Sequence, residues 1–198
     1  MTAVSCIVEG HGEVASLPIL LRRISAWRSP ALHIEIPQPI RVPRDRFLNR
    51  TDEFTRHLEL AAKKSGDEGW ILILLDADDD CPRALGQHLI ERSRNCLPHR
   101  MISVVLANRE FEAWFIGAAQ SLNGKRGFLC ESNDHHEEAE RRRDAKGWIR
   151  ERMSGKSYGE TTDQPAFTSA MDLQQAFDHC RSFRKLCTEW DRLAAHAA

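Results

Sequence analysis

The stretch that decides the fold is Trp70–Asp80, WILILLDADDD, in which an apolar run leads directly into a turn rich in aspartate. The run Trp70–Leu75 shows no alternation of apolar and polar residues, which is typical of a central parallel strand covered on both faces. Parallel sheets carry their functional side chains just beyond the carboxyl ends of the strands. The acidic turn therefore predicts a functional site at the end of this strand.

The segments on either side of this strand predict a repeated strand and helix pattern. Further strands are expected at Ala3–Val8, within Leu32–Ile36 and at Met101–Ala107, and helices at Ser16–Trp27, from Thr51 to Gly66 and at Pro82–Arg94. Alternation of this kind indicates parallel strands joined by right-handed helical crossovers. The expected fold class is therefore α/β, with a central parallel sheet of about four strands flanked by helices.

The pattern changes from about Gly124. Residues Glu131–Arg152 carry few large apolar side chains apart from Trp148 and Ile149, which predicts a solvated helix or an insertion. Helical periodicity returns in Ala170–Ala194, and we expect this segment to pack back on the sheet. The predicted organisation is an α/β core over residues 1–122 and a helical or irregular C-terminal extension over residues 123–198.

Composition limits the classes of protein that the chain can represent. With 41% hydrophobic and 29% charged residues it is typical of a globular protein that folds alone. We find neither an apolar run near the roughly 20 residues of a spanning helix nor a signal-peptide pattern, so we expect a cytoplasmic protein with no membrane partner. Six scattered cysteines fit reduced thiols. A formal charge of -1 excludes a global basic surface, so a polyanion must bind locally.

Acidic residues follow two of the predicted strands. Glu9 comes directly after the first strand, and Asp76 and Asp78 come after the third, so all three are expected to meet across one crevice. In an extended turn the two aspartates would point to one side, roughly 6.6 Å apart. Carboxylates that converge without a basic partner repel one another, and Mg²⁺ or Mn²⁺ is the usual means of neutralising them. We therefore predict a divalent-metal site here.

Other acids near the same strand ends have two interpretations. Glu13 begins the first helix, where it either caps the helix or acts as a second metal ligand. Glu110 and Glu112 share this ambiguity, and Glu112 is the candidate to complete the metal sphere. Asp79 and Asp80 are expected to cap the helix that starts near Pro82.

A phosphodiester bound at an acidic site needs positive charge nearby. The candidates for phosphate or nucleic-acid binding are Lys156 in GKSYG and Arg184 and Lys185 in SFRKL. The alternative is that these are ordinary solvated helix charges.

The motifs VEGHGE and LLDADDD together resemble the Toprim domain shared by topoisomerases, DnaG-type primases and the overcoming-lysogenization-defect nucleases. The match covers about residues 3 to 120 and implies a Toprim-like, Rossmann-like sheet. It also implies that Glu9 acts as general acid or base, and that Asp76 and Asp78 bind Mg²⁺ for phosphodiester cleavage or transfer.

The longer pattern of VEGxxE, LLDAD, NREFEAW and SFRKL is similar to an uncharacterised bacterial Toprim-like family associated with ATPase partners in phage-defence-type loci. The resemblance implies a nuclease subunit rather than a topoisomerase, because no domain with a nucleophilic tyrosine accompanies the sole tyrosine, Tyr158. DNA is expected as the substrate ahead of RNA. A catalytically inactive binding or assembly module is the alternative, and a homo-oligomer is compatible with either. A phosphorylated receiver domain fits the acid spacing less well.

Overall fold

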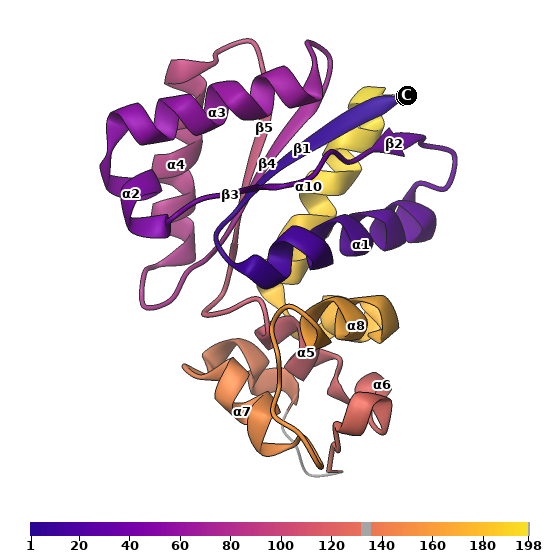
Figure 1. Ribbon diagram of the computed structural model, residues 1–198. Coiled ribbons are helices and arrows are strands. Elements are labelled where there is room, and N and C mark those ends of the chain that lie inside the picture. Colours follow the sequence, from indigo (N-terminus) through magenta and orange to yellow (C-terminus); the bar gives the residue numbers. More distant parts are fainter. Residues whose placement is uncertain (132–135, 198) are drawn as a thin grey trace.

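The computed structural model describes residues 1–131 and 136–197 and contains a five-stranded parallel sheet (Figure 1). The strands are β1 (Thr2–Val8), β2 (Ile34–Glu35), β3 (Ile40–Arg41), β4 (Trp70–Asp76) and β5 (Met101–Ala107). Their order is β2-β1-β4-β5, and β3 pairs with the far end of β1. The predicted α/β fold class with a central parallel sheet flanked by helices is confirmed.

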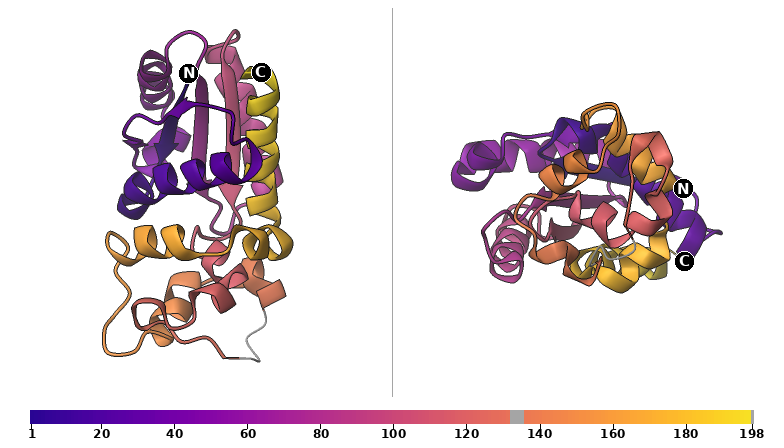
Figure 2. Two further views of the ribbon diagram at one scale, coloured as in Figure 1. Left: turned by 90° about the vertical axis from the view of Figure 1, so that its right-hand side faces the viewer. Right: turned by 90° about the horizontal axis from the view of Figure 1, so that it is seen from below.

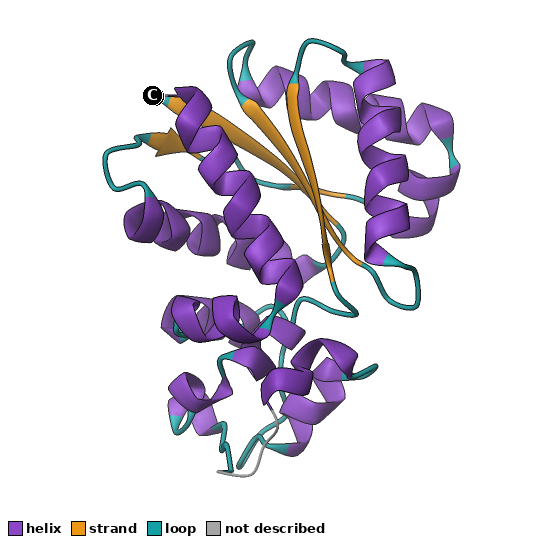
Figure 3. Cartoon of the chain, turned by 180° about the vertical axis from the view of Figure 1, so that it is seen from behind, coloured by secondary structure: helices purple, strands orange, loops and turns teal. Residues whose placement is uncertain are grey.

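Helices cover both faces of the sheet. On one face lie α1 (His11–Arg28) and α10 (Arg181–Ala197), and on the other lie α2 (Arg44–Asn49), α3 (Thr51–Ser65) and α4 (Pro82–Cys96). Figure 2 shows the sheet between α3 and α10, and Figure 3 shows α10 lying across its face. Residues of β4 alternate between the two buried clusters, which explains its unbroken apolar sequence.

A second group of helices lies beyond the carboxyl ends of the strands (Figure 1). It comprises α5 (Ala113–Gly117), α6 (Ala119–Leu122), α7 (Ala145–Glu151), α8 (Asp163–Ala170), α9 (Leu173–His179) and the 3-10 turns η1 (Lys125–Gly127) and η2 (His136–Arg141). Phe111, Trp114 and Phe167 join this group to the hydrophobic cluster under α1 and α10. Within the described residues, no helix has the length and apolar character to cross a membrane.

Local structure departs from the sequence prediction at three places. Helix α1 begins at His11, earlier than expected, and Pro18 lies inside it. The three prolines within residues 37–46 predict a loop without ladder pairing, yet Ile40 and Arg41 pair with β1 between two of these prolines, and α2 follows them. The charged stretch predicted to be solvated instead buries Trp148 and Ile149 of α7, while its residues 132–135 lie outside the described residues.

Candidate functional site

Strand pairing brings a group of carboxylates together at one end of the sheet. Strand β1 pairs directly with β4, so the turn after β1, which carries Glu9, lies beside Asp76 at the end of β4. The first turn of α1 and the segment after β5 begin at the same end because all the strands are parallel. We call the resulting group the acidic cluster: Glu9, Glu13, Asp76, Asp78 and Glu112.

Asp76 is the buried centre of the acidic cluster. Its Oδ1 accepts a hydrogen bond of 2.8 Å from the backbone N–H of Phe111. Burial raises the pKa of Asp76 well above its usual range, and the neighbouring Glu13, Glu112 and Glu9 raise it further. In the absence of added positive charge, these surroundings therefore disfavour the ionised form of Asp76.

Glu9 and Asp78 lie on the more open side of the acidic cluster. Burial raises the pKa of Glu9 to about 7, with added repulsion from Asp78 and Glu13 and an opposing effect of Arg44. The buried Glu9 Oε2 has no hydrogen-bond partner among the described residues. Asp78 is exposed and has φ of 50°, so the turn is not the extended one predicted from the Asp-x-Asp spacing. Its N–H donates to the carbonyl of Arg109 over 3.0 Å.

Glu13 and Glu112 are joined by a side-chain amide from α8. Gln164 Nε2 donates to Glu13 Oε1 over 3.3 Å and to Glu112 Oε1 over 3.1 Å. Glu13 Oε2 also accepts from the N–H of Gly10, so Glu13 has the helix-capping role that the sequence left open. Tyr158 donates its hydroxyl to Glu112 Oε1 over 3.0 Å. The second oxygen of Glu112 is buried without a hydrogen bond from any described residue.

Burial also raises the pKa of Glu112 to about 7, with added repulsion from Glu13, although Lys146 opposes the shift. Glu112 therefore resembles Asp76 and Glu9 in its environment. All three carboxyls lie where the negative charge is unfavourable unless a cation is close.

Two basic residues that sequence reasoning missed lie against the acidic cluster. Arg44 Nε is 3.6 Å from both Glu9 Oε2 and Asp78 Oδ2. Lys146 Nζ is 4.0 Å from Glu112 Oε2, and the surrounding carboxylates raise the pKa of this amine. The expectation of carboxylates without a basic partner was therefore wrong. Arg44 is the first residue of α2 and directly follows the prolines of residues 37–43, whereas nothing in the local sequence distinguishes Lys146 from its charged neighbours.

Asp79 and Asp80 do not cap α4 as predicted. The N-cap residue of α4 is Cys81, and among the described residues no side chain forms a capping hydrogen bond with this helix. Asp80 Oδ2 instead accepts from Arg44 Nη2 over 2.6 Å, and Asp79 Oδ1 accepts from Arg109 Nη1 over 2.7 Å. The aspartates of the turn are thus held by arginines from other segments.

The three predicted phosphate-binding residues interact away from the acidic cluster. Lys156 Nζ is 2.5 Å from Asp163 Oδ1, Arg184 Nη1 donates to the carbonyls of Phe177 and Asp178, and Lys185 Nζ is 2.5 Å from Glu189 Oε1. Within the described residues, none of the three forms an ion pair with a member of the acidic cluster.

The acidic cluster has the oxygen ligands of a cation site, but its side chains are not yet arranged around a single cation position. The buried oxygens Glu9 Oε2 and Glu112 Oε2 accept no hydrogen bond from any described residue and have only the longer ion pairs with Arg44 and Lys146. Both belong to carboxyls with raised pKa values, which fits a hard divalent cation that prefers oxygen ligands. In the described part of the chain, no three acidic, histidine or cysteine side chains are already arranged to share one metal ion. Cation binding here would require side-chain movement.

Comparison with known proteins gives one family. The model of the family described as Domain of unknown function (DUF4276) matches residues 8–190, and the chain therefore belongs to that family. Neither the curated proteins nor the solved structures contain a match.

Proposed function

We propose that this member of the family is a Toprim-type nuclease subunit, in which the acidic cluster binds Mg²⁺ or Mn²⁺ for phosphodiester hydrolysis. The observation that carries the proposal is the meeting of Glu9, Asp76 and Glu112, three carboxyls with raised pKa values, at the carboxyl ends of parallel strands. The Toprim affiliation itself rests on the motifs VEGHGE and LLDADDD.

The ligands proposed for the cation are Asp76 and Asp78, joined by Glu112 and by Glu13 if its capping bond to Gly10 opens. Asp76 keeps Oδ1 on the N–H of Phe111, which leaves its second oxygen for the cation. A bound divalent cation would neutralise these carboxylates and polarise a phosphodiester. Gln164 and Tyr158 would hold Glu112 in place through hydrogen bonds to its other oxygen.

Glu9 is proposed to handle the proton. A carboxyl with a pKa of about 7 exchanges a proton close to neutral pH, which suits a general acid or base. Arg44 and Lys146 are better placed than Lys156, Arg184 or Lys185 to attract an anionic substrate, because only the first two lie against the acidic cluster. We extend the proposal to DNA ahead of RNA, and to a cytoplasmic protein acting with an ATPase partner in a bacterial defence-type system. This extension is supported by the sequence resemblance alone.

The enzymatic proposal is tested with purified protein, alone and with its neighbour-encoded ATPase, incubated with plasmid DNA, single-stranded DNA and RNA. We expect cleavage in Mg²⁺ or Mn²⁺ and none in EDTA. Asp76→Asn and Glu9→Gln should each reduce the rate by about a hundredfold or more. Asp67→Asn is the matched control, because Asp67 is fully exposed and lies at the other end of the sheet. The absence of cleavage in every arm would contradict the nuclease proposal.

A binding or assembly module is the second candidate, and the ion pairs that Arg44 forms with the acidic cluster favour it. The guanidinium of Arg44 interacts with Glu9, Asp78 and Asp80. It therefore neutralises some of the negative charge that a bound metal ion would otherwise neutralise. Thermal unfolding distinguishes the two candidates. Excess Mn²⁺ should raise the melting temperature of a metal-binding protein through mass action, and should leave a metal-free module unchanged.

A further inference from the structure

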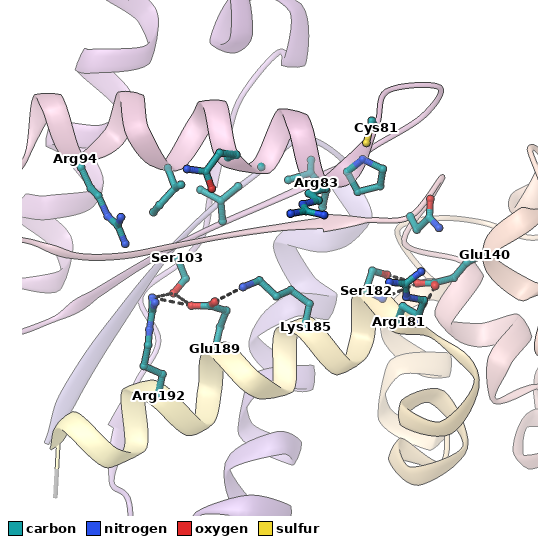
Figure 4. A pocket seen from close by; sticks show the side chains of 17 residues that line it. Cys81, Arg83, Arg94, Ser103, Glu140, Arg181, Ser182, Lys185, Glu189 and Arg192 are labelled. Carbon is teal, nitrogen blue, oxygen red and sulfur yellow. Dashed lines mark hydrogen bonds and ion pairs between the residues drawn. The ribbon is translucent and has the colours of Figure 1, made fainter.

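A groove of about 700 Å³ lies between α4 and α10, along strand β5 (Figure 4). Its walls come from the two helices, and its floor includes Ser103, Val104 and Leu106 of β5. Val104 and Leu106 belong to the buried cluster on the α4 face. The hydroxyl of Ser103 instead donates a hydrogen bond to Glu189 of α10 on the opposite face. Because the groove touches side chains on both faces of β5, it opens onto the edge of that strand.

Strand β5 is the last strand of the sheet and pairs only with β4 among the described strands. The carbonyl of Ala107 accepts from Ala77 on the β4 side, whereas that of Ile102 accepts from Arg192 Nη2 over 3.3 Å on the other side. Backbone groups alternate between the two edges of a strand, so the N–H and C=O groups of Val104 and Leu106 point away from β4. The groove therefore presents backbone donors and acceptors that pair with none of the residues the structure describes.

Basic side chains mark both ends of this groove. Arg83 and Arg181 lie at the starts of α4 and α10, and Arg94 and Arg192 lie near their ends (Figure 4). Arg83 and Arg94 are eleven residues apart on α4, and Arg181 and Arg192 are eleven residues apart on α10. Eleven helical residues correspond to an axial separation of roughly 16 Å. Arg192 is paired with Glu189. The side chains of Arg83, Arg94 and Arg181 form no hydrogen bond or ion pair with any residue that the structure describes.

The middle of the groove differs from its ends. Val104, Leu106 and Ile90 supply apolar surface, and Lys185 shares the single carboxylate of Glu189 with Arg192. Among its described lining residues the groove has no aromatic side chain, whereas grooves for single-stranded nucleic acid stack bases on aromatic rings. A second copy of the chain would bring the same arginines face to face. The charges therefore favour an acidic protein segment over both alternatives.

We propose that this groove binds an extended acidic segment of a partner protein, which adds as a strand beside β5. A strand of five or six residues spans roughly 16 to 20 Å, the distance between the basic ends. The occupant would carry acidic residues at both ends and β-branched residues in the middle. Backbone hydrogen bonds to Val104 and Leu106 would supply affinity, and the arginines would select the charge. The inference does not depend on metal binding or on nuclease activity.

The test uses a fluorescein-labelled peptide, Glu-Glu-Val-Thr-Val-Glu-Glu, titrated with the full-length protein and followed by fluorescence anisotropy. Lys-Lys-Val-Thr-Val-Lys-Lys and an oligomer of deoxythymidine are the comparison probes. Two protein variants address the two interactions. The double variant R83E/R94E reverses unpaired charges on α4. Val104→Pro removes one outward N–H, and a strand at the edge of a sheet tolerates proline. The double variant R22E/R46E is the matched control, because both of these arginines are exposed outside the groove.

The proposal expects the acidic peptide to bind and the basic peptide not to bind. R83E/R94E and Val104→Pro should each weaken binding about tenfold or more, and R22E/R46E should leave it within about twofold. If Val104→Pro does not fold, the charge variants alone decide the outcome. Absence of binding by the acidic peptide would overturn the proposal. So would tight binding of the oligonucleotide that competes with the peptide and is lost in R83E/R94E, because the groove would then be a phosphate site.

Discussion

At the scale of single residues, Glu112 links the acidic cluster to the stability of the fold. Burial raises its pKa from the ordinary 4.5 to about 7. Between these two pH values, the folded protein holds a proton on Glu112 that the unfolded chain has released. The stabilisation that this proton provides is present in full below about pH 4.5 and is lost as the pH rises to about 7.

We therefore expect wild-type protein without metal to lose stability relative to Glu112→Gln between about pH 5 and pH 7. The glutamine keeps an oxygen for Tyr158 and Gln164 but cannot ionise. Melting temperatures of the two proteins, measured in EDTA across this range, check the prediction. Curves that stay parallel from pH 5 to pH 7.5 would mean that Glu112 ionises normally in the folded state.

Arg44 is the second residue whose removal has a distinct consequence. Arg44→Ala should lower the stability of the metal-free protein by about 1 kcal/mol, because three carboxylates lose a shared cation. The same variant should show a larger Mn²⁺-induced rise in melting temperature than wild type, since the metal then has no competing guanidinium. Arg46→Ala, exposed on the same helix, should do neither. An unchanged response to Mn²⁺ in Arg44→Ala would show that Arg44 and metal do not compete.

The residues of the site show how far sequence reasoning reaches. Glu9, Asp76 and Asp78 could be predicted because strand ends are visible in the sequence and parallel strands bring their ends together. Lys146 and Gln164 could not be predicted, because they come from segments whose positions depend on how the C-terminal helices fold over the strand ends.

At the scale of elements, α10 packs on one face of the sheet through Trp190. Trp190 is fully buried and packs edge-on against Trp70 of β4, with ring centroids 6.0 Å apart. Trp190→Ala should cost about 3 to 5 kcal/mol of unfolding free energy, because it removes a large buried side chain and leaves a cavity. Trp27→Ala is the control, since Trp27 is exposed and should cost less than about 1 kcal/mol. Urea unfolding measures both values, and equal losses would mean that α10 does not pack as described.

The elements that could be predicted from the sequence are those with a long apolar pattern, and the elements that were missed are short. Strands β4 and β5 were predicted to within a residue or two because their apolar runs are unbroken, and helices α3 and α4 because their apolar residues recur at helical spacing. Strand β3 and helix α2 were missed because each is short, and because β3 lies between two prolines and α2 directly follows Pro43. In the folded chain β3 pairs with β1 and α2 packs against α3.

At the scale of the whole molecule, the hydrophobic core runs through both halves of the chain. One buried cluster contains Val4 and Trp70 from the sheet together with Phe167, Phe183 and Trp190 from the last third of the sequence. The sequence predicted a core over residues 1–122 with an extension packed on it. The shared cluster indicates that the first part depends on the second for the covering of one sheet face.

A fragment of residues 1–122 should therefore fail to fold on its own, because the face that α10 covers would expose Trp70 and its apolar neighbours to water. Circular dichroism and amide NMR spectra of the fragment test this expectation. The full chain should unfold in a single cooperative transition. A well-dispersed spectrum from the fragment would show instead that the predicted boundary near residue 122 separates an independent domain.

The central claim is that the acidic cluster is a divalent-cation site, and a crystal soaked in Mn²⁺ tests it most directly. Anomalous difference maps should show a peak that is coordinated by Asp76 and by at least one of Asp78, Glu112 and Glu13, and the peak should vanish in Asp76→Asn. A map without a peak at the acidic cluster under saturating Mn²⁺, with Arg44 still between Glu9 and Asp78, would contradict the claim.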